Sequence, residues 1–99
     1  MNIPDFQTIM LPLLKFTADG KSHEIGEAIS FLAGEFQLSN EEREVLISSG
    51  QSKFSNRVGW AKTYLKKAAL IEYPQRGRFR ITPRGVNVLT ENPSTINMH

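Results

Sequence analysis

Two residue types that can hydrogen-bond to the edges of nucleic-acid bases stand side by side in the middle of this sequence. Asn56 and Arg57 come near the start of an apolar repeat that begins at Lys53. A side-chain amide can bind adenine bidentately, and a guanidinium can bind guanine in the same way, when both enter the major groove of a duplex. The chemistry that this pair favours is base recognition, not catalysis.

The sequence around this pair is strongly basic. Nine of the twelve lysines and arginines lie between Lys53 and Arg84, and the one acid in that stretch is Glu72. The residues before Lys53 carry eight acids and three bases, so the net charge of +2 conceals an acidic first half and a basic second half. Cations concentrated on one segment are typical of a protein that binds a polyanion, most simply nucleic acid.

A long helix from Lys53 to about Ala68 would position these residues. Its apolar side chains recur every three or four residues along one face, at Phe54, Val58, Ala61, Leu65 and Ala68. The rest of the helix then turns polar and basic groups outward. The candidate DNA-binding residues on it are Lys53, Asn56, Arg57, Gly59, Thr63, Lys66 and Lys67. Exposed lysines often do no more than keep a helix soluble, so Asn56 and Arg57 are stronger indications of DNA binding than the lysines.

A β-hairpin is predicted after this helix. Residues 71–73 and 78–81 alternate between apolar and polar side chains, and Pro74 and Gly77 mark the turn between them. The alternation places four apolar residues on a buried face, namely Ile71, Tyr73, Phe79 and Ile81. It leaves three candidate phosphate-binding residues, with Arg78 and Arg80 on the other face and Arg76 at the tip. A hairpin that is merely solvated would more commonly mix both charge signs.

The other elements complete a fold class. Helical spacing or capping residues predict helices at residues 5–17, 25–36 and 40–47 and a last helix that starts at Thr82-Pro83, with the pattern stopping after residues 91–93, and residues 21–24 read as a short edge strand. In the last helix, Val86, Leu89 and Val88 are expected to dock on the body. We therefore expect a mainly α winged helix-turn-helix domain, with three helices, the third long and basic, then a wing and a closing C-terminal helix.

Several other classes of protein are disfavoured. With no cysteine and only the distant His23 and His99, the chain offers no disulfide, zinc finger or histidine-based metal site. The short motif Asp19-Gly20-Lys21 has the acid-x-lysine form found in nucleases, but it lies in a turn without supporting residues. No catalytic or metal-binding residue is assigned. The longest apolar run, residues 9–14, contains Pro12 and is too short to span a membrane, so we expect a soluble, cytoplasmic protein.

Trp60 leaves two interpretations open. Its projected position borders the polar face of the long helix, where it could stack on a base or sugar. Packing at the edge of the core, beside Tyr64 four residues later, is the favoured interpretation because of the apolar area it would bury. Trp60 and Thr63 are also the candidates for an apolar contact with a methyl group on a base.

The run from Asn56 to Ala68, followed by Gly77 and by Ile81 to Gly85, resembles the N-terminal domain of the Mrr restriction-system proteins. Ile3-Pro4 and Met10 to Leu14 resemble the first helix of that domain. The resemblance implies a type IV, modification-dependent restriction endonuclease that acts on methylated DNA.

In such a protein an N-terminal winged helix binds double-stranded DNA, and a separate C-terminal domain holds a Mg²⁺-dependent nuclease. Residues 1–92 would be the DNA-binding domain, without a cofactor of its own, and residues 93–99 the start of a linker to the absent nuclease domain. This chain should then bind DNA and not cut it. The sequence leaves open which modified base is recognised and whether the full-length protein forms a homo-oligomer.

A protein–protein interaction or dimerisation module is the alternative. Winged helices also dock on proteins, and the acidic helices predicted at residues 25–36 and 40–47 could face a basic partner.

Overall fold

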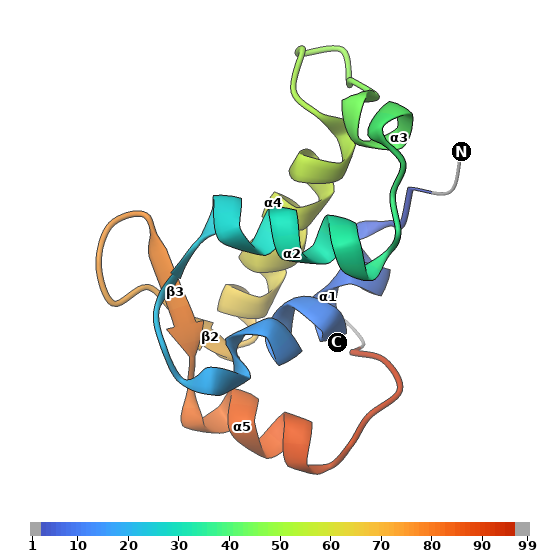
Figure 1. Ribbon diagram of the computed structural model, residues 1–99. Helices are drawn as coiled ribbons and strands as arrows, with labels where there is room; N and C mark the ends of the chain where they lie inside the picture. Colours follow the sequence, from blue (N-terminus) through green and yellow to red (C-terminus); the bar gives the residue numbers. More distant parts are fainter. Residues whose placement is uncertain (1–2, 97–99) are drawn as a thin grey trace.

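The computed structural model describes residues 3–96, which form a helical body with a small antiparallel sheet at one side (Figure 1). In chain order the elements are α1 (Phe6–Phe16), the 3₁₀ helix η1 (Thr17–Asp19), β1 (His23–Glu24), α2 (Ile25–Glu35), α3 (Asn40–Glu44), α4 (Lys53–Lys67), β2 (Ile71–Glu72), β3 (Arg78–Ile81) and α5 (Pro83–Thr90). This order is that of a winged helix-turn-helix domain, as predicted, with β2 and β3 as the wing. The four helices that the described residues hold before the wing correspond to the four predicted segments, although the predicted fold class counted three because it left out the short helix at residues 40–47, now α3.

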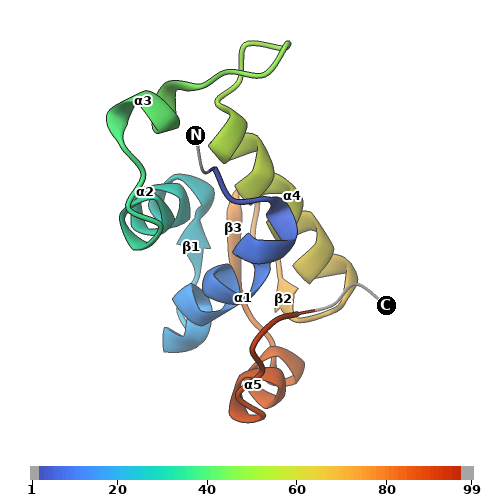
Figure 2. The ribbon, with the colours of Figure 1, turned by 90° about the vertical axis from the view of Figure 1, so that its right-hand side faces the viewer.

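Helix α4 runs along one side of the structure and packs chiefly against α1 (Figure 2). Its buried face consists of Phe54, Val58, Ala61 and Leu65, as the apolar spacing predicts. The prediction was wrong for Ala68, which is exposed because it is the C-cap of the helix and follows its last turn. The ring of Phe6 in α1 stacks on Tyr64 in α4 with centroids 5.0 Å apart.

The capping residues fix where the helices begin. Asp5 accepts a hydrogen bond from the backbone N–H of Thr8 at 2.8 Å, and α1 continues through Pro12 without ending. Ser39 and Glu42 form the predicted capping box at the start of α3. However, α3 ends at Glu44 and does not reach Ile47.

The reason for this early end lies in the loop that follows. Val45 is extended, with φ −62° and ψ 127°, and Leu46 forms a β-bridge with Ser52. The loop thus folds back on itself as a small hairpin at the N-terminal end of α4, where it projects from the body (Figure 1).

The sheet joins the wing to the first half of the chain. Its strand order is β1-β3-β2, and both pairs are antiparallel, with His23 opposite Phe79 and Ile71 opposite Ile81. Ile71, Phe79 and Ile81 are buried as predicted, but Tyr73 is 44% exposed. The strand β2 ends at Glu72, so the alternation that would have buried Tyr73 no longer applies there.

Helix α5 closes the fold through a glycine. Thr82 caps the helix by accepting a hydrogen bond from the N–H of Gly85 at 3.1 Å. A Cβ added to Gly85 would collide with the carbonyl oxygen of Leu70 and lie 2.7 Å from Cγ1 of Ile81. The close contact of the backbone at Gly85 holds the start of α5 against the body. Val88 and Leu89 pack on the core. Val86, which was expected to dock as well, is exposed.

After α5 the chain returns to the body, where Ile96 is buried in the core. Residue 96 thus packs on the body, while the domain boundary at residue 92 stays a prediction. Residues 97–99 of the predicted linker lie outside the described residues.

Residues 3–96 lack a membrane-spanning helix and a cluster of metal-binding side chains. None of their helices combines the length and the apolar character that crossing a membrane requires. The described side chains also hold no group of three or more histidine and acidic residues arranged to bind a metal ion.

Candidate nucleic-acid interface

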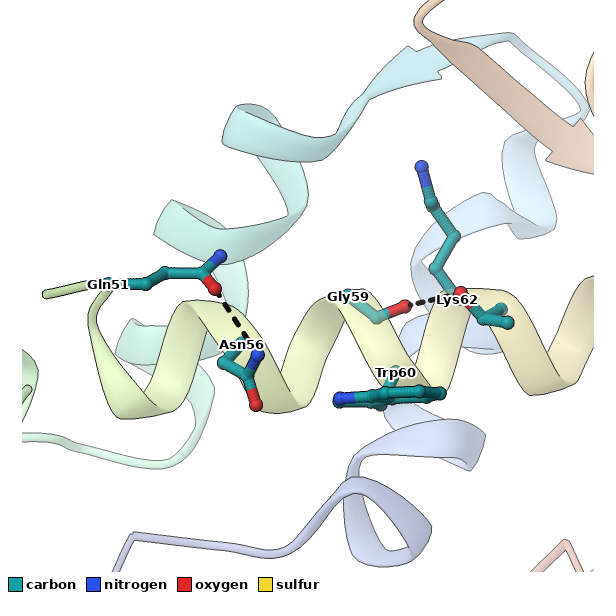
Figure 3. Close-up of a pocket in the computed structure, with 6 residues that line it drawn as sticks. Gln51, Asn56, Gly59, Trp60 and Lys62 are labelled. Atoms are coloured by element: carbon teal, nitrogen blue, oxygen red, sulfur yellow. Dashed lines mark hydrogen bonds between the residues drawn. The ribbon is translucent and has the colours of Figure 1, made fainter. Parts of the chain in front are cut away.

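The outer face of α4 carries a shallow pocket. Six residues line it, namely Gln51, Asn56, Gly59, Trp60, Lys62 and Thr63. Figure 3 shows Trp60 and Lys62 at opposite edges of the helix with Gly59 between them. Three of the predicted DNA-binding residues, Asn56, Gly59 and Thr63, are thus brought together.

Asn56 is held in place by the loop before the helix. Its Nδ2 donates a hydrogen bond to Oε1 of Gln51 at 3.2 Å (Figure 3). This contact orients the amide and leaves its Oδ1 available as an acceptor, next to the second proton of Nδ2. An acceptor and a donor side by side are what a bidentate contact with adenine requires.

Arg57 does not share this pocket. Its Nη1 donates hydrogen bonds to the backbone oxygens of Ile3 at 2.8 Å and Pro4 at 3.2 Å. The guanidinium therefore fastens the segment before α1 to α4. One residue along a helix turns a side chain by about 100°, which carries Arg57 to the flank that faces α1.

The wing forms a second depression beside α4, lined by Lys62, Tyr73, Gln75, Arg76, Gly77 and Arg78. Lys62 belongs to both depressions and joins the helix face to the wing. Its Nζ lies 5.1 Å from the ring centroid of Tyr73, and that of Lys66 lies 5.4 Å from the same ring. Such cation–π contacts hold ammonium groups in place without neutralising them.

The three arginines of the wing have different environments. Arg78 donates to Oγ of Ser22 at 2.9 Å, to the backbone oxygen of Ser22 at 2.9 Å and to Oε1 of Glu24 at 3.1 Å, and its side chain is 29% exposed. Arg80 forms an ion pair with Glu72 on the neighbouring strand at 2.7 Å. Arg76, at the turn, is exposed and forms no ion pair with any described side chain.

Some of the predicted cations form neither an ion pair nor a side-chain hydrogen bond with a described residue, namely Lys53, Lys66, Lys67 and Arg76. Lys62, which was not predicted, forms none either. Nζ of Lys67 lies 5.4 Å from the ring centroid of Tyr64. Arg57, Arg78 and Arg80 instead use their guanidiniums inside the domain.

Trp60 packs on Tyr64, as the favoured interpretation has it, and its contact with DNA stays a prediction. Its ring stacks on Tyr64 with centroids 6.0 Å apart, but the side chain is 49% exposed and lies outside the buried core. A large apolar surface is thus presented on the otherwise polar face of α4.

Sequence reasoning did not select Gln51, Lys62 and Tyr73 as site residues. Lys62 lies near the border between the core face and the polar face, where a helical projection does not show whether a side chain points inward or outward. Tyr73 was placed in the core by its strand alternation. Gln51 lies in a loop, and only the hydrogen bond with Asn56 reveals its position.

His23 has a structural role next to β1. Its Nδ1 lies 2.9 Å from Glu27 and its Nε2 lies 3.0 Å from Asp19. Burial of the ring opposes protonation, but the hydrogen bonds to Glu27 and Asp19 outweigh it, so the pKa of His23 is raised. The same carboxylate of Asp19 accepts a hydrogen bond from the backbone N–H of Lys21, so the acid-x-lysine motif stabilises a turn.

Comparisons with known proteins identify the family of this chain. The chain matches the Mrr N-terminal domain over residues 6–91. It is 30% identical over 97 residues to the type IV methyl-directed restriction enzyme EcoKMrr of Escherichia coli (strain K12), covering 94% of this chain and 31% of that protein. The chain therefore spans about a third of the length of that relative. No solved structure gives a significant match. The chain belongs to the family of Mrr N-terminal domains.

Proposed function

We propose that this chain binds double-stranded DNA, with α4 in the major groove and the wing along the adjacent phosphate backbone. The observation that carries the proposal is that Lys62 lines both the pocket on α4 and the depression beside the wing. The amide of Asn56 and the exposed guanidinium of Arg76 therefore belong to one surface. A duplex can then meet base-reading and phosphate-binding groups together.

In this proposal the side chains have different roles, which follow from their environments. Asn56 is the candidate for a base contact, with Gly59 and Thr63 beside it. The candidates for phosphate contacts are the cations of α4 and the wing whose side chains form neither an ion pair nor a hydrogen bond with a described residue, namely Lys53, Lys62, Lys66, Lys67 and Arg76.

For the full-length protein we propose a type IV restriction endonuclease that acts on methylated DNA. The relative is described as a methyl-directed restriction enzyme, and this chain spans about a third of its length. In this proposal the chain supplies DNA binding in the cytoplasm, and a Mg²⁺-dependent nuclease domain outside it cuts. Incubation of this chain with methylated DNA and Mg²⁺ should give no cleavage product, and a product would contradict the assignment.

The test of DNA binding is a salt titration. Fluorescence anisotropy of a labelled mixed-sequence duplex should show log K falling against log salt by about 0.9 for each phosphate contact. With four or five contacts, the affinity should fall about 150- to 500-fold between about 50 and 200 mM salt. The double variant Lys66→Gln/Lys67→Gln should reduce the slope by about two.

Lys15→Gln is the control, because Lys15 is also exposed but lies on α1. A slope that the double variant leaves unchanged would refute the proposed surface. Absence of DNA binding, together with a complex with a protein partner, would instead support the interaction or dimerisation module.

A further inference from the structure

Gly59 occupies a position where neither the backbone nor the packing of the domain requires glycine. It is the seventh of fifteen residues in α4, and its φ is not among the positive values found in this chain. A Cβ built on it would meet nothing within 4 Å. Glycine is the least favourable residue in a helix interior apart from proline, so this choice weakens the helix without an internal benefit.

Two other helical glycines have equally open surroundings, but their positions differ. Gly26 is the second residue of α2 and Gly34 its second-last, where a helix tolerates glycine more easily. Gly85 is the opposite case, because the backbone of Leu70 fills the space that a side chain would need. Among the described helical glycines, Gly59 alone combines a central position with an open outer face.

The absent side chain leaves a hollow with an apolar wall. On one edge stands the ring of Trp60, which is kept in place by a stack that runs through Tyr64 to Phe6, with centroid separations of 6.0 and 5.0 Å. Thr63 donates its hydroxyl proton to the backbone oxygen of Gly59 at 3.1 Å. The side chain of Thr63 therefore offers a ligand a methyl group and an oxygen acceptor, but no donor.

A polar wall stands next to this apolar one. The amide of Asn56, oriented by Gln51, lines the same pocket. A ligand that matches both walls carries a small apolar group beside hydrogen-bonding atoms. In the major groove that description fits a base with a methyl group, on C5 of a pyrimidine or on N6 of adenine.

We propose that the hollow over Gly59, walled by Trp60 and Thr63, receives a base methyl group in the major groove while Asn56 binds the polar edge of the base. The inference rests on the proposed binding of duplex DNA. It assigns the sensing of methylation to α4 itself and to three residues of its outer face.

The experiment compares duplexes that share one mixed sequence and differ only in their methyl groups. One duplex is unmodified, one carries 5-methylcytosine, one carries N6-methyladenine, and one has uracil in place of thymine. Fluorescence anisotropy at constant salt gives the affinity ratio between each duplex and the unmodified one. The proteins compared are the unaltered chain and the variants Gly59→Ala, Trp60→Gln and Gly34→Ala.

We expect one of the two methylated duplexes to bind about four- to tenfold more tightly than the unmodified one, since burial of one methyl group on an aromatic wall is worth that much. The arm that shows the gain identifies the source of the methyl group. The uracil duplex should bind more weakly than the unmodified one if C5-methyl groups are read. Gly59→Ala and Trp60→Gln should bring the ratio close to one, because the first fills the hollow and the second removes its wall.

Two internal controls keep the result interpretable. Gly59→Ala should raise Tm by about 3–8 °C, since alanine favours the helix, so its loss of discrimination cannot come from unfolding. Gly34→Ala should keep the full ratio. Ratios near one for the unaltered chain in every arm, or a ratio that Gly59→Ala preserves, would overturn the inference while leaving salt-dependent DNA binding intact. Absence of salt-dependent binding to every duplex would overturn the proposed function as well.

Discussion

The two arginines at the turn and on the strand of the wing allow a sharp test, because their side chains differ in environment but not in chemistry. Arg76 is exposed and forms no ion pair with a described residue, whereas Arg78 donates three hydrogen bonds to Ser22 and Glu24. We therefore expect Arg76→Gln to change DNA binding and Arg78→Gln to change stability.

The magnitudes follow from these contacts. Loss of one phosphate contact makes the slope of log K against log salt shallower by about 0.9. Between about 50 and 200 mM salt, the factor by which the affinity falls should therefore be about threefold smaller for Arg76→Gln than for the unaltered chain. The stability of Arg76→Gln should change by no more than about 0.5 kcal/mol. Arg78→Gln removes hydrogen bonds from a charged group whose partner Glu24 is 64% exposed, so we expect about 1–2 kcal/mol of destabilisation.

Two measurements on each variant test the different roles expected for Arg76 and Arg78. Thermal unfolding should show a Tm lowered by about 4–15 °C for Arg78→Gln and nearly unchanged for Arg76→Gln. Anisotropy titrations well below Tm should show the shallower slope for Arg76→Gln alone. If Arg78→Gln reduced the slope as much as Arg76→Gln and left Tm unchanged, the strand arginine would be a phosphate ligand and the reasoning from its internal contacts would be refuted.

Two further predictions concern the fold. Gly85→Ala should destabilise the domain by about 1–3 kcal/mol in urea unfolding, because the new Cβ collides with Leu70 and lies 2.7 Å from Ile81. The control Gly34→Ala, whose Cβ meets nothing within 4 Å, should be neutral or slightly stabilising. Equal effects of the two substitutions would show that α5 shifts freely. The raised pKa of His23 means that its ion pairs with Asp19 and Glu27 stabilise the fold fully below about pH 6.5 and lose this effect as pH rises through the raised value. The urea midpoint should therefore fall more between about pH 6 and 8 for the unaltered chain than for His23→Gln, and parallel curves would exclude the effect.

Local patterns were sufficient to predict most of the elements. The register of α4 follows from four apolar residues at helical spacing, and Ser39 and Thr82 mark the starts of α3 and α5 by capping alone. These features depend on neighbours within one or two turns of the chain, which the sequence displays directly. The end of α3 was missed because it depends on the bridge between Leu46 and Ser52, a contact across a loop.

The candidate site was less predictable, for the same physical reason. The partners of Arg57 and Arg78 lie more than fifty residues away in the sequence, at Ile3 and Ser22. The local sequence pattern is the same for an arginine that hydrogen-bonds to the backbone of its own domain and for one that is available to bind a phosphate. Residue type and helical projection therefore identified the basic face, but only tertiary contacts separate the arginines engaged within the fold from those that are not.

The clamp formed by Arg78 has a consequence for how a duplex would fit. It ties β3 to β1 and to the segment before it, and Lys62 and Lys66 of α4 contact the ring of Tyr73, so hinge motion of the wing would break several contacts at once. The distance between the helix and the wing is then set before any encounter. The nucleic acid would have to adjust its groove width and curvature to this fixed span. Flexible base steps should therefore favour binding even at positions that no side chain reaches.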